Sequence, residues 1–138
     1  MTAIQSHIRS LECYVERCGG SVVRAMLPEA IHGRTSRDCI TLHAGLEPYQ
    51  QLSALVHELT HWLAHRDAPR DFCASATIYE YEAEAVESLV MRRLGLPTPA
   101  EDTAAADSDR PTDGLLTSSV KRVRSTAFRI CEALELDV

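Results

Sequence analysis

The chain has 138 residues, of which 45% are hydrophobic and 25% charged, and these are ordinary values for one globular domain with its own core. A net charge of −6 disfavours the phosphate backbone of nucleic acids as the main ligand, and no apolar run reaches the ~20 residues of a membrane span. Five cysteines without C-x-x-C spacing, behind an N-terminus without a signal-peptide pattern, predict reduced thiols and a cytoplasmic location.

The first part of the chain predicts one helix and a small sheet. Residues 2–18 place their apolar side chains on one helical stripe, and Gly19 and Gly20 end the pattern. Residues 22–27 suggest a short strand, and residues 39–43 show the alternation of a half-buried strand. After Gly33 we expect a polar turn between them.

A helix is predicted from Pro48 to about Arg66, because proline suits a first helical turn and Pro69 prevents continuation. Its large apolar residues project to one side: Leu52, Leu55, Val56, Leu59, Trp62 and Leu63. The opposite side carries His57, Glu58, His61 and His65. One face is therefore suited to a core and the other to chemistry.

The sequence His57-Glu-Leu-Thr-His61 has the H-E-x-x-H form of zinc metallopeptidases. Histidines four apart lie one turn apart on the same helical face, so His57 and His61 can both bind one Zn²⁺ ion. Glu58 is the predicted general base, because a carboxylate beside the first ligand can take a proton from water at the metal.

His65 invites the alternative in which three histidines bind the metal. It lies eight residues after His57, which is about 12 Å along a straight helix, and no glycine bends the chain back. One ion cannot reach both ends of that span. We therefore expect His65 to hydrogen-bond a ligand, to contact substrate, or to face the negative helix end.

The missing third ligand is expected on a second helix, predicted over residues 74–94 and ended by Gly95. Glu82 projects into the middle of the apolar arc of this helix, where a carboxylate is costly unless it is paired or coordinated. The cost of an unpaired carboxylate in an apolar arc favours Glu82 over Glu84 and Glu87 as the ligand. Together with Glu80, those two are expected to form a solvated acidic face.

The remaining chain consists of a predicted flexible loop over residues 98–114 and a last helix over residues 118–136. The last helix has one apolar face and several basic residues: Lys121, Arg122, Arg124 and Arg129. We interpret the basic residues as a solvated helix face in preference to a nucleic-acid contact.

Two stretches resemble the ImmA/IrrE-type zinc peptidases and are similar to the metallopeptidase domain of ArdC-type antirestriction proteins: His57-Glu-Leu-Thr-His-Trp-Leu-Ala-His65 and Tyr79-Glu-Tyr-Glu-Ala-Glu-Ala-Val-Glu-Ser-Leu-Val90. In that family H-E-x-x-H-x-x-x-H precedes a helix of the type E-x-E-A-N. Glu80-x-Glu82-Ala83 matches this pattern, and Glu84 replaces the asparagine. The resemblance implies Glu82 as the third zinc ligand.

The length favours a single domain over residues 1–138. The resemblance covers residues 30–95 well and the last helix loosely, and it implies an α+β fold of the minimal zincin type. It implies a zinc-dependent endopeptidase with a protein substrate such as a helix-turn-helix repressor, in stress response or in phage or mobile-element control. The alternative is a non-catalytic module that uses zinc as scaffold to capture a repressor or a restriction enzyme. The presence of Glu58 weighs against it, because zinc affinity needs only the ligands.

Overall fold

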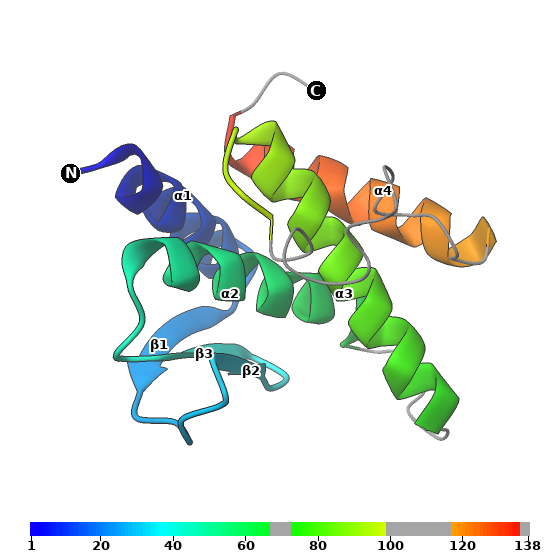
Figure 1. Cartoon of the computed structure of the whole chain (residues 1–138), viewed down its shortest axis with the longest axis horizontal. Coiled ribbons are helices and arrows are strands. Elements are labelled where there is room, and N and C mark those ends of the chain that lie inside the picture. The colour runs from blue at the N-terminus through cyan, green and yellow to red at the C-terminus, as the bar shows by residue number, and fades with distance from the viewer. Residues whose placement is uncertain (67–72, 99–116, 136–138) are drawn as a thin grey trace.

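A computed structural model describes residues 1–66, 73–98 and 117–135 (Figure 1). Within these ranges the protein is α+β, with four α-helices, one short π-helix and a three-stranded sheet. This confirms the predicted fold class. The loop predicted over residues 98–114 lies, apart from its first residue, outside the described residues.

The sheet contains β1 (Ser21–Ala25), β2 (Gly33–Thr35) and β3 (Cys39–His43) in the order β1-β3-β2. Central β3 runs parallel to β1 and antiparallel to β2. The prediction of a polar turn directly after Gly33 was wrong, because Gly33–Thr35 pair with β3 as a third strand. Three residues are too short to show an alternation, yet this strand forms one edge of the sheet.

The helices are α1 (Ala3–Arg17), α2 (Pro48–Thr60), α3 (Cys73–Arg93) and α4 (Thr117–Ala133). Thr2 begins α1 with a capping box to Gln5, and Gly95, at φ +75°, follows α3 in the left-handed conformation that favours glycine. No helix in the described ranges is long and apolar enough to cross a membrane.

Helix α2 lies at the centre of the molecule, between the sheet and the α3–α4 pair (Figure 1). Its apolar side packs into one continuous core with residues of the sheet and the other helices: Leu52, Leu55, Val56 and Leu59 with Leu11, Val15, Ile40, Leu42, Val86, Val90 and Ile130. Full burial of each such side chain stabilises the fold by about 1.5–3 kcal/mol. The core therefore fixes the helix that carries the H-E-x-x-H motif.

The last turn of this helical stretch differs from the straight helix expected to Arg66. Residues His61–His65 form a π-helix, in which each hydrogen bond spans five residues and the turn is wider than in an α-helix. Trp62 is buried in this turn, and its indole N–H donates to the carbonyl of Arg37. The widened turn places His65 in the interior of the protein, where its side chain is fully buried.

Candidate metal centre

His57 and His61 of α2 meet Glu80 of α3. The two imidazole rings lie 5.1 Å apart, centroid to centroid. The Glu80 carboxylate reaches both of them, with Oε2 3.2 Å from His57 Nε2 and Oε1 2.7 Å from His61 Nε2. One donor atom from each of the three residues lies within 4.8 Å of the other two.

The chemistry of these donors fits a metal ion. Two imidazole nitrogens and one carboxylate oxygen are a common protein ligand set in catalytic zinc sites, which leave a fourth position open. Ligand atoms about 2.0–2.2 Å from one ion lie some 3–4 Å apart, in keeping with the observed grouping. Because 55% of the Glu80 side chain is exposed, the site is accessible from solution.

Glu82, the ligand expected from the sequence, does not join the two histidines. Its side chain is buried as predicted, but its carboxylate accepts hydrogen bonds from Ser119 Oγ at 2.6 Å and from Arg122 Nε and Nη2 at 2.9 and 2.8 Å. His65 Nε2 lies 2.8 Å from the same carboxylate. Residues two apart project about 200° from one another on a helix, so Glu80 and Glu82 occupy opposite faces of α3.

His57 has a second carboxylate behind it. Its Nδ1 lies 3.1 Å from Glu87 Oε2, and Glu87 also accepts a hydrogen bond from Ser53. The expectation of a solvated Glu87 was wrong, because this side chain is buried against α2. Glu84 is exposed, as expected.

His61 is supported by His65. The two Nδ1 atoms lie 2.9 Å apart, and the His65 ring stacks on Tyr79 with 4.4 Å between centroids. His65 lies outside the group formed by His57, His61 and Glu80, in agreement with the argument from helix length. Of its expected roles, the geometry shows the hydrogen bond to a ligand candidate.

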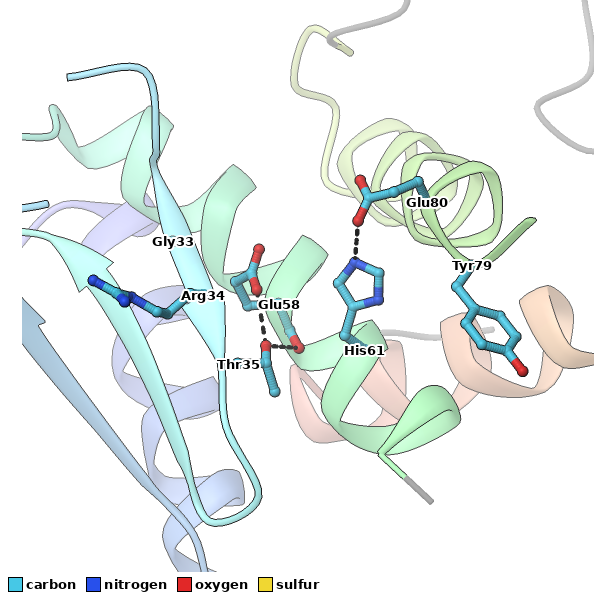
Figure 2. A pocket seen from close by; sticks show the side chains of 7 residues that line it. All are labelled: Gly33, Arg34, Thr35, Glu58, His61, Tyr79 and Glu80. Carbon is cyan, nitrogen blue, oxygen red and sulfur yellow. Dashed lines mark hydrogen bonds and ion pairs between the residues drawn. The ribbon is translucent and has the colours of Figure 1, made fainter. Parts of the chain in front are cut away.

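Glu58 projects between α2 and the edge strand β2 (Figure 2). The Thr35 hydroxyl lies 2.8 Å from Glu58 Oε1 and 3.0 Å from the Glu58 backbone oxygen. A Cβ on Gly33 would lie only 2.9 Å from Glu58 Cγ and 3.1 Å from the Thr41 carbonyl. Glycine at this position therefore allows β2 to approach the Glu58 side chain closely.

Burial and neighbouring charges shift the pKa values of His57, His61 and Glu58 in different directions. Burial acts to lower the pKa of His57, but the carboxylates of Glu87, Glu80 and Glu58 outweigh it and raise this pKa to about 9. Burial lowers the pKa of His61, against the opposing effect of Glu80. In the metal-free protein His57 therefore carries a proton at neutral pH, and His61 is neutral. Burial also raises the pKa of the Glu58 carboxyl, against the hydrogen bond from Thr35.

Two adjoining hollows, of about 290 and 400 Å³, open along this site and share Gly33, Glu58 and Glu80. The smaller one is also lined by His61 and Tyr79, while the larger one extends past His57. Figure 2 shows the Tyr79 hydroxyl directed away from Glu58 and Glu80. Together the hollows form a groove along β2 with the candidate metal ligands at its middle.

Comparison with known families agrees with this geometry. The family model of IrrE N-terminal-like domains, Peptidase M78, matches residues 19–118, well over half of the chain. The chain belongs to this family. No curated protein and no solved structure matches it. Membership in Peptidase M78 makes this a metallopeptidase-type domain and confirms the resemblance to ImmA/IrrE-type peptidases.

Sequence reasoning overlooked the neighbours that the Peptidase M78 motif residues acquire in the fold. Glu80, Glu84 and Glu87 have the i, i+4, i+7 spacing of one helical stripe, and two of them meet His57. That stripe was a usable signal, because the polar face of α3 is the one available to the histidine face of α2. No comparable signal pointed to Thr35 or to Arg122.

Proposed function

We propose that this protein is a zinc-dependent endopeptidase that cleaves a protein substrate. The observation that carries the proposal is the meeting of His57, His61 and Glu80 beside Glu58, in a groove along a sheet edge. Glu80 replaces Glu82 in the proposed ligand set, because Glu80 faces both histidines while the carboxylate of Glu82 is bound to α4.

When bound, zinc supplies Lewis acidity toward a peptide carbonyl and lowers the pKa of water to about 7. Glu58 takes a proton from the attacking water and later delivers it to the leaving amine nitrogen. The Thr35 hydroxyl orients the Glu58 carboxylate for both transfers. Burial raises the pKa of Glu58, which brings the carboxylate closer to a group that can accept and return a proton near neutral pH.

Among the described residues no strand pairs with the outer edge of β2, and this edge provides a template for an extended substrate. Two backbone hydrogen bonds of 2.8 Å, from His43 N to His32 O and from Ser36 N to Cys39 O, show which residues face β3. The backbone N–H and C=O groups of residues 32, 34 and 36 are directed toward that strand. In an antiparallel pair the alternate residues point the other way, so the peptide groups of Gly33 and Thr35 face the outer edge. A substrate strand that pairs there would pass the proposed zinc ligands.

We further propose an intracellular substrate, such as a helix-turn-helix repressor in stress response or in phage or mobile-element control. This part of the proposal is supported by the family alone. It is tested by co-expression with candidate regulators from neighbouring genes, followed by mass spectrometry of the products.

Glu58→Gln separates the peptidase from the alternative, a zinc-scaffolded binding module. The amide cannot act as a base but leaves the proposed ligands in place. We expect cleavage to fall about 10²–10⁴-fold while zinc content stays that of the wild type. A Glu58→Gln protein with full biological effect and bound zinc would instead establish the binding module.

A further inference from the structure

A continuous chain of polar contacts runs from His61 to helix α4. His61 Nδ1 lies 2.9 Å from His65 Nδ1, and His65 Nε2 lies 2.8 Å from Glu82 Oε1. The Glu82 carboxylate then accepts from Ser119 and from two nitrogens of Arg122. His65 and Glu82 are 0% and 1% exposed, so water does not compete for the contact between these two side chains.

The polarity of this chain follows from its two ends. Glu82 accepts hydrogen bonds from the Arg122 guanidinium and from Ser119, so it is a carboxylate and must also accept from His65 Nε2–H. A neutral His65 protonated on Nε2 can only accept at Nδ1. With a metal on its Nε2, His61 would carry its proton on Nδ1 and donate to His65. Without the metal, His61 Nε2 lies 2.7 Å from Glu80 Oε1, and a proton on Nε2 donated to that carboxylate competes with the Nδ1–H form.

The polar contacts end at Ser119 and Arg122, which lie outside the residues that the family model matches. The family match stops at residue 118, and Ser119 and Arg122 follow it on α4. Ser119 is buried at 1% exposure. Arg122 is bidentate on Glu82, the strongest geometry for an arginine–carboxylate pair.

We propose that Ser119 and Arg122 are positioning residues of the metal centre, which act through Glu82 and His65 to fix the tautomer and the orientation of His61. Helix α4 thereby supports one ligand, while His57 is supported independently by Glu87. The inference rests on the proposed metal site but is independent of peptidase activity.

The test measures Zn²⁺ affinity by competition with a chromogenic chelator, at a temperature where each variant is folded by circular dichroism. We expect Arg122→Met to weaken affinity on the order of 10–100-fold, as is typical for groups that orient a ligand. Lys121→Met is the matched control, since it removes an exposed neighbouring cation and should match the wild type. Arg122→Lys keeps the charge with fewer hydrogen bonds and should recover part of the affinity.

A second readout separates positioning from general stability. In the zinc-free protein, the ¹⁵N spectrum should show a larger fraction of His61 protonated on Nδ1 in the wild type than in Arg122→Met, because the contact of Nε2 with Glu80 is the same in both. If Arg122→Met does not fold, Ser119→Ala removes one hydrogen bond and should change both readouts in the same direction. Wild-type affinity and tautomer in these folded variants would overturn the inference alone. A wild-type protein that binds no zinc would overturn the proposed site as well.

Discussion

The glutamates on the two faces of α3 differ in exposure and in the residues that they contact. Glu80 faces the groove, is half exposed, and meets the Nε2 atoms of His57 and His61. Glu82, two residues later, is almost fully buried and is bound to α4. We call the side of α3 that carries Glu80 and lines the groove the open face, and the side that carries Glu82 and packs against α4 the closed face. Glu80 on the open face can bind a metal ion, and Glu82 on the closed face can hold other side chains in position.

This difference shows why burial alone does not identify a metal ligand. A carboxylate in an apolar arc does need a partner, and Glu82 has one. The partner is a guanidinium from a helix some forty residues away, which supplies charge and two hydrogen bonds. A catalytic metal also needs an open coordination position, so its ligands belong beside the groove.

The largest effect expected from the comparison is that of Glu80→Ala. Loss of one of three protein ligands should weaken Zn²⁺ binding by about 100-fold or more and abolish detectable cleavage. The free energy of unfolding of the zinc-free protein should stay near that of the wild type, because Glu80 is largely exposed. Glu84→Ala, an exposed glutamate one turn further along α3, is the control and should retain zinc.

Glu82→Gln should have a smaller effect on zinc and a larger one on the fold. The amide of glutamine has one oxygen and one NH₂ group, and the NH₂ group cannot accept from the Arg122 guanidinium or from His65 Nε2–H. At least one buried hydrogen bond is therefore lost. We expect a decrease of about 1–3 kcal/mol in the free energy of unfolding, measured in urea with excess chelator. Zinc affinity should fall on the order of 10–100-fold. A variant with unchanged stability would contradict the description of the closed face.

Thr35→Val tests the open face with a still smaller change. The Thr35 hydrogen bond lowers the pKa of Glu58 against the raising effect of burial, so its removal should raise that pKa further. Glu58 must be ionised to act as a base. The acidic limb of the plot of kcat/KM against pH should therefore move to higher pH. Thr35→Ser keeps the hydroxyl and should restore the wild-type profile. A limb that moves to lower pH in Thr35→Val would refute this role.

Much of the fold could be predicted from the sequence because it depends on local pattern. The stripe on α1, the alternation in β3 and the signals at Pro48 and Gly95 each act within a few residues. Strand β2 could not be predicted from the sequence, because three residues are too few to show an alternation of apolar and polar side chains. Its pairing with β3 is a tertiary contact.

The residues of the candidate site likewise separate into those that local spacing predicts and those that depend on how the helices pack. The spacing of His57 and His61 and the position of Glu58 follow from one helix turn, so the motif alone predicts them. The choice between Glu80 and Glu82 depends on which face of α3 meets α2. The partner of Glu82 depends on where α4 packs, and neither arrangement is encoded by local spacing.

The most direct test of the account is a crystal structure of the zinc-loaded protein with anomalous diffraction measured at the zinc absorption edge. We predict one anomalous peak about 2.0–2.2 Å from His57 Nε2, His61 Nε2 and a carboxylate oxygen of Glu80. Glu82 should remain on Ser119 and Arg122. A peak coordinated by Glu82, with Glu80 turned to solvent, would contradict it.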